Sequence, residues 1–191
     1  MSTTPRRNPP KRELTPEYTL LGLLMAGPSH GYDLHQRLTT ELGNVWRLSQ
    51  SQVYSVLKRL EQHGDVTARR RLQSKLPARQ VLHITAAGTK RFTKWLEGAA
   101  GSSARTVRLE FLTRLYFADQ LMPKQAARIY EAQARETART IRRLRTALAQ
   151  TPDSQLINRM SIDLRLRQME LIRTWLREIR VRFRIKAGKE K

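Results

Sequence analysis

The stretch SQSQVYSVLKRLEQHG, residues 49–64, constrains the fold more than any other part of the sequence. Ser49 followed by Gln52 is the pattern of a capping box, which predicts that a helix begins here. Counted from that start, the apolar side chains recur on one face and should point inward: Val53, Leu57 and Leu60. The N-terminal end and the outer side are left with polar groups that can bind base edges or phosphates: Gln50, Ser51, Tyr54, Ser55, Lys58 and Arg59. A merely solvated helix face would carry similar residues.

The segments around this helix narrow the choice. Two helices are predicted before it, one beginning at Thr15-Pro16-Glu17 and one running from Tyr32 to Leu42. After Gly64 the pattern alternates in VTARRRLQ and ARQVLHIT, separated by SKLP, which predicts a hairpin; Thr85 then caps a fourth helix. Three helices followed by a hairpin is the order of a winged helix-turn-helix. The hairpin would be a basic wing carrying Arg69, Arg70, Arg71, Lys75 and Arg79.

Beyond the small-residue linker GAAGSSA the strand signals fade and long helical periodicities begin. Pro123 begins a helix with an apolar seam of Ala127, Tyr130, Ala134, Thr137, Ile141, Leu144 and Leu148. After Thr151-Pro152-Asp153, a last helix has a second seam of Ile162, Leu166, Met169, Ile172, Leu176, Ile179 and Phe183. Leu164, Leu171 and Trp175 lie at a different angle on the last helix. We therefore expect an antiparallel pair with apolar surface left over for a homodimer.

The predicted fold is mainly α with a small β-hairpin: an N-terminal winged helix-turn-helix and a C-terminal antiparallel long-helix dimerisation domain. The expected divisions are a flexible basic arm at 1–13, the DNA-binding domain at 14–97, a linker at 98–104, the dimerisation domain at 105–186 and a basic tail at 187–191. The dimerisation residues are expected to be Tyr130, Ile141, Leu144, Ile162, Leu166, Met169, Ile172, Leu176 and Ile179.

The charge balance favours a polyanionic partner. The chain has 37 Lys and Arg against 16 Asp and Glu, a formal charge of +21, and both halves contribute: 16 basic against 7 acidic residues through Glu97, and 21 against 9 after it. Nucleic acid is the leading partner and an anionic membrane surface the second. With no cysteine, no spanning apolar run and no secretion signal, the sequence predicts a cytoplasmic, nucleoid-associated protein.

Signals for catalysis or metal binding are weak. The histidines at 30, 35, 63 and 83 have no ligand spacing, and no nucleophile triad or phosphate-binding glycine loop is present. We expect no enzyme activity, no metal and no cofactor. Trp46 is interpreted as a packing residue in the turn before residue 49.

Three stretches resemble the PadR family of transcriptional regulators: LLGLLMAGPSHGYDLHQRL, WRLSQSQVYSVLKRLEQHG and HITAAGTKRFTKWL. The similarity spans about residues 16–97, and the helices after 104 are similar to the dimerisation region of longer members. The sequence departs from the family in the wing, where LPARQVLHIT replaces a run of arginines and aromatics. The resemblance implies a dimer on a palindromic operator, usually a repressor and sometimes an activator. It also implies that Tyr32, Ser51, Tyr54 and Lys58 lie against DNA and that Arg59 contacts a phosphate.

Members of this family often sense small aromatic molecules, which implies an effector pocket near Tyr116, Tyr130 and Trp175. Core packing is the alternative role for Trp175, and closure of the small core is the alternative role for Tyr32 and Tyr54. The alternative function for the whole chain is a basic architectural or scaffold protein that binds polyanions without sequence preference.

Overall fold

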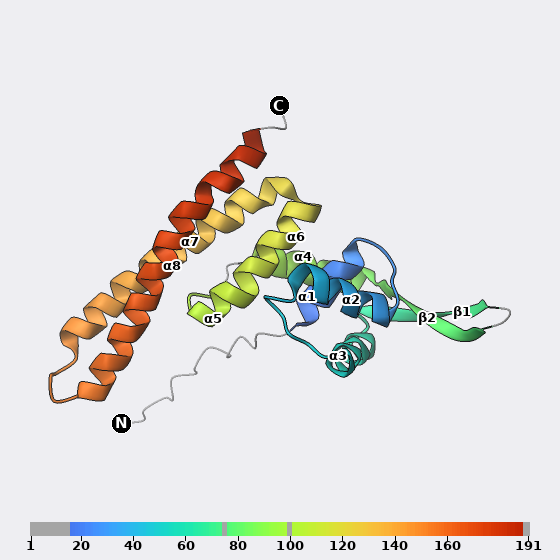
Figure 1. Cartoon of the computed structure of the whole chain (residues 1–191), viewed down its shortest axis with the longest axis horizontal. Coiled ribbons are helices and arrows are strands. Elements are labelled where there is room, and N and C mark those ends of the chain that lie inside the picture. Colours follow the sequence, from blue (N-terminus) through green and yellow to red (C-terminus); the bar gives the residue numbers. More distant parts are fainter. Residues whose placement is uncertain (1–15, 74–75, 99–100, 189–191) are drawn as a thin grey trace, which may run out of the picture.

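The computed structural model describes residues 16–73, 76–98 and 101–188, with side chains described outside 70–79 and 181–188. The elements are α1 (Glu17–Met25), α2 (Gly31–Leu42), α3 (Gln50–Gln62), β1 (Val66–Gln73), β2 (Leu76–Ile84), α4 (Ala86–Glu97), α5 (Ala104–Thr106), a π-helical turn (Val107–Phe111), α6 (Leu112–Leu121), α7 (Pro123–Gln150) and α8 (Leu156–Gly188). Helices α1–α4 form a head from which the hairpin projects, and α7 and α8 form a long pair at the other end (Figure 1). This arrangement confirms the predicted fold class.

The hairpin is antiparallel, with Val66 opposite Ile84 and Arg69 opposite Val81. A short bridge between Ser29 and Leu82 attaches the turn before α2 to β2, through two backbone hydrogen bonds of 3.1 and 2.9 Å. The prediction that SKLP forms the turn was wrong at its end, because β2 already begins at Leu76. Pro77 is tolerated there because each strand of a two-stranded ribbon has an unpaired edge.

The chain turns sharply between α3 and β1. Gly64 has a positive φ of 74°, a conformation that residues with a Cβ rarely adopt. The predicted Thr85 cap of α4 is confirmed: its hydroxyl accepts a hydrogen bond from Gly88 N at 3.1 Å and donates to Gly64 O at 2.7 Å. Thr85 therefore caps α4 and also stabilises the turn between α3 and β1. The predicted cap of α1, Thr15, lies outside the described residues.

A single buried core runs from the head into the helices that follow it. Phe92 of α4 meets Phe117 of α6 edge to face at 5.4 Å between ring centroids, and Gly22 of α1 leaves room for the Phe117 ring. Trp46 is buried and donates a hydrogen bond to Thr113 Oγ1 at 2.8 Å. Hydrophobic packing therefore continues across the predicted linker, and α6 is fixed against the head.

Helices α7 and α8 pack antiparallel, and they contribute Ile141, Leu144, Leu166 and Met169 to a second buried cluster. Tyr130 donates from its hydroxyl to Leu176 O at 2.6 Å. One position of the predicted α7 seam was wrong: Ala127 is exposed and Ala126 is buried, because the buried stripe lies one residue earlier at this end. The predicted tail begins too early, since α8 continues to Gly188; the arm at 1–13 and residues 189–191 lie outside the described residues.

Candidate DNA-reading surface and adjoining pocket

The N-terminus of α3 has the predicted capping box. Ser49 Oγ accepts from Gln52 N at 3.3 Å, and Ser49 N donates to Gln52 Oε1 at 2.8 Å. The predicted inner face is confirmed by the burial of Val53, Leu57 and Leu60, to which the structure adds Val56. Because the cap fixes where the helix begins, it also fixes which side chains face outward.

The outward side chains of α3 are all exposed: Gln50, Ser51, Tyr54, Ser55, Lys58 and Arg59. Two hydroxyls have local partners, since Ser51 Oγ shares a hydrogen bond with Ser49 Oγ at 2.9 Å and Ser55 Oγ donates to Ser51 O at 2.9 Å. Either side chain can exchange this local bond for one to DNA at small net cost.

Two exposed tyrosines lie beside this face. Tyr32 at the start of α2 is 57% exposed and Tyr54 is 47% exposed. They line a hollow of about 880 Å³ together with Lys58 of α3 and Gln80 of β2. A Cβ on Gly31 would come within 2.8 Å of the Tyr54 ring, so the glycine lets that ring lie across the start of α2. Tyr54 thus combines a packed ring with an accessible hydroxyl, which fits both predicted roles.

In the wing, Arg69 is exposed on β1. The backbone places Arg70 opposite Gln80 and Arg71 opposite Arg79. The side chains of Arg70, Arg71 and Arg79, and the whole of Lys75, lie outside the described residues. The predicted wing contacts therefore remain predictions.

Behind α3, four side chains of alternating charge link the elements of the head: Arg59, Glu17, Arg91 and Asp65, called the ladder below. Glu17 of α1 is buried and pairs with Arg59 of α3, at 3.5 Å, and with Arg91 of α4. Arg91 also pairs with Asp65, which is buried where the wing begins. Burial alone would lower the pKa of Arg91, but hydrogen bonds to Asp65 and Tyr18 and the charges of Glu17 and Asp65 raise it above its ordinary value. Arg91 therefore stays charged.

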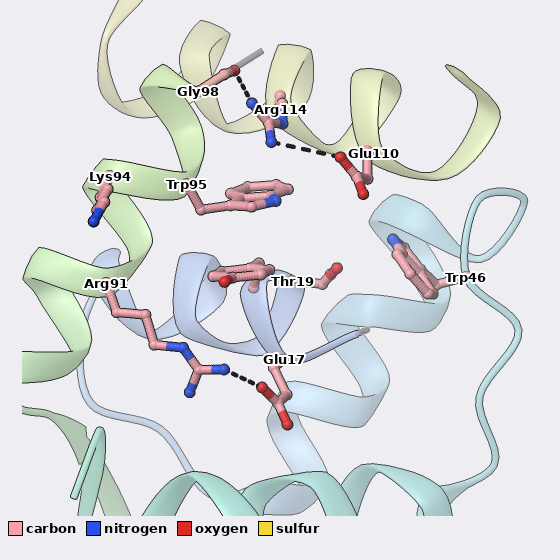
Figure 2. A pocket seen from close by; sticks show the side chains of 10 residues that line it. Glu17, Thr19, Trp46, Arg91, Lys94, Trp95, Gly98, Glu110 and Arg114 are labelled. Carbon is pink, nitrogen blue, oxygen red and sulfur yellow. Dashed lines mark hydrogen bonds and ion pairs between the residues drawn. The ribbon is translucent and has the colours of Figure 1, made fainter. Parts of the chain in front are cut away.

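Glu17 and Arg91 also line a cavity of about 650 Å³ between the head and the π-helical turn (Figure 2). One wall is a stack: the Arg114 guanidinium lies 4.6 Å from the Trp95 ring, and the Trp95 ring lies 4.7 Å from Tyr18 with only 4° between their planes. The complete lining is Glu17, Tyr18, Thr19, Trp46, Arg91, Lys94, Trp95, Gly98, Glu110 and Arg114. The cavity therefore combines aromatic surfaces with both signs of charge.

Two polar groups of this lining have no partner among the described residues. Thr19 is 1% exposed, and its hydroxyl has no hydrogen-bond partner there. Lys94 is exposed, and no described side chain pairs with it. A buried hydroxyl without a partner is costly, so it is suited to a ligand that supplies one. Sequence reasoning missed this site, because its residues come from α1, the turn before α3, α4 and its C-terminal cap, the π-helical turn and α6, and nothing in their spacing links them.

The predicted effector residues Tyr116, Tyr130 and Trp175 do not together line one of the cavities described here, so an effector role for them stays a prediction. Tyr130 is buried and bonded to Leu176 O, and Trp175 packs edge to face on Phe111 with 6.3 Å between ring centroids. Tyr116 lines a smaller hollow of about 400 Å³, where it donates to Glu41. Burial and this hydrogen bond raise the pKa of Tyr116 to about 12. The packing of the half-buried Trp175 against the core fits its alternative role.

The predicted dimerisation residues lie mostly within the single chain. Tyr130, Ile141, Leu144, Leu166, Met169 and Leu176 are buried, and Ile162, Ile172 and Ile179 pack against them. The predicted seam is correct in phase, but its partner is the other helix of the same chain. Among the described side chains of α8, the large apolar ones that are exposed are instead Leu156, Ile157, Met160, Leu164 and Leu171.

No group of three or more His, Cys, Asp or Glu side chains in the described part of the chain is placed to hold a metal ion. In the same part of the chain, no helix is both long enough and apolar enough to cross a membrane.

Comparison with known proteins supports the resemblance found in the sequence. Residues 20–94 match the family model for the transcriptional regulator PadR-like family. The negative transcriptional regulator PadR of Bacillus subtilis (strain 168) is 31% identical over 117 residues, which cover 61% of this chain and 64% of that protein, just under two thirds. Both matches are to transcriptional regulators rather than to enzymes.

Two crystal structures of B. subtilis PadR are also similar. The complex with operator DNA is 25% identical, with 87% of this chain and 98% of that chain covered and a TM-score of 0.44. The complex with p-coumaric acid is 24% identical, with 88% and 98% covered and a TM-score of 0.40. The family match extends from α1 through the wing into α4, the part of the chain whose motifs carry the resemblance, so this part of the chain is a PadR-like domain of the kind found in transcriptional regulators.

Proposed function

We propose that this chain is a sequence-specific DNA-binding repressor that acts as a homodimer on a palindromic operator and is released by a small aromatic effector. The observation that carries DNA binding is the face of α3, where a capped helix presents only exposed polar side chains beside two exposed tyrosines and the wing. Such a helix reads the major groove while arginines of the wing hold phosphates.

The test is fluorescence anisotropy with duplex DNA from upstream of this protein's own gene, against a scrambled duplex, at low and near-physiological salt. A specific regulator should prefer the first duplex by about a thousandfold, and should keep that preference when salt rises. Equal binding that collapses with salt on both duplexes, and no enriched sequence after selection from random DNA, would instead support the architectural alternative.

We expect Tyr54→Ala to weaken operator binding about tenfold or more, because it removes one directional contact to DNA and the ring that lies over Gly31. The measurement is operator affinity at fixed salt, with circular dichroism to check folding. Tyr54→Phe is the matched control, since it keeps the ring and removes only the hydroxyl. If the alanine variant binds like wild type, Tyr54 takes no part in DNA reading.

The homodimer is supported by the exposed apolar strip on the first half of α8, from Leu156 to Leu171. Ile157, Leu164 and Leu171 repeat every seven residues, so they lie along one side of the helix. A second copy of the same helix, related by two-fold symmetry, can cover this strip with its own. Such a dimer also places two heads on one palindromic site.

The effector site is supported by the cavity between Trp46 and the Tyr18–Trp95 stack. Its lining suits a flat aromatic acid: Lys94 can hold a carboxylate, and Thr19 can bond a hydroxyl group. The ligand of the B. subtilis relative, p-coumaric acid, carries a hydroxyl on its aromatic ring and a carboxylate at the end of an unsaturated side chain of that ring, and is therefore the first probe to use.

We expect p-coumaric acid to change the tryptophan fluorescence of this protein, since two of its three tryptophans line the cavity. A Trp175→Phe background isolates Trp46 and Trp95, and Lys94→Gln in that background should weaken binding about tenfold by removing the partner of the carboxylate. Lys90→Gln is the matched control, because Lys90 is on the same helix outside the cavity. Equal binding by both variants would remove Lys94 from the site.

A further inference from the structure

Glu17 is shared between the two surfaces to which function is assigned. One of its carboxylate oxygens faces Arg59 at 3.5 Å, on the recognition helix; the other accepts from Arg91, in the wall of the cavity. Glu17 itself lines the cavity and is buried, whereas half of the Arg59 side chain is exposed. The carboxylate therefore holds a DNA-facing arginine from behind.

The second carboxylate on Arg91 extends the connection to the wing. Asp65 N donates to Leu60 O at 2.9 Å, and Thr85 N donates to Asp65 O at 3.0 Å, so Asp65 joins the end of α3 to the cap of α4. On the other side, the Arg91 guanidinium lies 5.4 Å from the Tyr18 ring, at the end of the stack that begins with Arg114 of α6. A continuous set of contacts thus links α6, the cavity wall, α3 and the wing.

We propose that Glu17 is a positioning residue of the DNA-reading surface. Through Glu17, binding of a ligand in the cavity changes the position of the Arg59 side chain. This inference rests on the proposed function, because it takes α3 as the DNA-reading helix and the cavity as the effector site.

The charges explain why the linkage should be sensitive. Arg59, Glu17, Arg91 and Asp65 together are neutral, and both carboxylates are buried. A buried charge that loses a partner carries a large penalty, so the carboxylate strengthens one pair when the other weakens. An anion held at Lys94, one helical turn along α4 from Arg91, competes with Glu17 for the Arg91 guanidinium. Glu17 then binds Arg59 more tightly and withdraws it from phosphate.

The ligand-free test compares Glu17→Gln with Glu97→Gln. Both remove one negative charge, but Glu97 is exposed at the end of α4 and outside the ladder. In wild type the charge of Arg59 is shared between Glu17 and phosphate, whereas in Glu17→Gln it neutralises phosphate alone. The salt dependence of DNA binding (log K against log salt) should therefore be steeper than in Glu97→Gln, by up to about 0.9. The preference for operator over scrambled duplex should fall about tenfold, because Arg59 is no longer held in place. In an Arg59→Gln background the two variants should behave alike.

The ligand test measures coupling, the ratio of p-coumaric acid affinities with and without saturating operator. By linkage this ratio equals the ligand's effect on operator affinity. We expect a coupling of tenfold or more in wild type and in Glu97→Gln, falling toward one in Glu17→Gln and in Arg59→Gln. The loss of coupling in Arg59→Gln is the more informative result, because Arg59 does not line the cavity and so does not contact a ligand bound there.

The outcomes separate the two proposals. Wild type without operator preference contradicts the proposed function, and wild type that ignores p-coumaric acid contradicts that effector; in both cases the salt dependence still decides whether Glu17 restrains Arg59. Glu17→Gln identical to Glu97→Gln in salt dependence and preference overturns the inference. If Glu17→Gln does not fold, Arg59→Gln alone decides it, since undiminished coupling there overturns the linkage.

Discussion

Replacing Gly88 with alanine should lower the free energy of unfolding by about 3 kcal/mol, the upper end of the range for overpacking. A Cβ on Gly88 would overlap the carbonyl oxygen of Asp65 and crowd Ile84 Cγ1 at 2.9 Å. The obstacle is backbone, and that backbone is held by the hydrogen bonds of Thr85 to Asp65 O, so it cannot move aside cheaply. Helix α4 would have to shift, and Arg91 with it.

Gly98→Ala is the matched control, because its Cβ would meet only ordinary contacts, at 3.4 Å from Trp95 O and 3.6 Å from Arg114 Nη1, without a positive φ. Urea unfolding followed by circular dichroism measures both variants. Equal midpoints for Gly88→Ala and wild type would mean that α4 and the wing are not packed as closely as described. This contact also gives a physical reason for a glycine in the HITAAG segment, which resembles the family motif.

Local rules account for what was predicted well from the sequence. The caps at Ser49 and Thr85 each depend on residues within one helical turn, and the inner face of α3 follows from its start. The change of period after Gly64 marks the hairpin because strands and helices repeat differently. From these local features, most of the DNA-reading face could be predicted.

Long-range contacts account for what was missed. Glu17 and Arg91 are 74 residues apart, and Trp46 and Thr113 are 67 apart, so no spacing rule brings them together. The π-helical turn at Val107–Phe111 also leaves no signal when the sequence is examined for the α-helical period of 3.6 residues. The effector prediction fell on Trp175 because of its residue type, its place on the long last helix and the resemblance to the family, whereas Trp46 and Trp95 line the cavity described here. An aromatic side chain indicates apolar surroundings, but only the fold decides whether they enclose a cavity.

The two faces of α8 show why periodicity alone cannot tell a surface for a second copy from one that packs within the chain. A seam at spacings of three and four indicates that a helix packs against something, but it does not say whether the partner belongs to the same chain. Here α7 covers the seam of Leu166 and Leu176, and the angle between the two stripes leaves Leu164 and Leu171 outside. The stripe of Leu164 and Leu171, which the sequence places at a different angle from the main seam, is therefore the one available to a second copy.

Substitution by lysine should separate these faces. Leu166→Lys with Leu176→Lys should unfold the α7–α8 pair, because each buried lysine must lose its charge or its packing at a cost of several kcal/mol. Leu164→Lys with Leu171→Lys should leave the helical circular dichroism signal and the unfolding of the monomer intact, since these side chains are 58% and 71% exposed, but should convert the dimer to monomer. Light scattering and thermal unfolding, measured on both double variants over the same concentration range, distinguish the two results.

The exposed pair is decisive for the proposed assembly. A monomeric Leu164→Lys, Leu171→Lys variant should bind a half-site about as well as wild type binds one, yet lose most of its affinity for the palindrome, because joining two heads raises the effective concentration of the second. Leu164→Ala with Leu171→Ala, which trims the strip without adding charge, should weaken the dimer less. If the lysine variant remains dimeric, the strip on α8 is not the interface, and the second copy must bind elsewhere on the helical region.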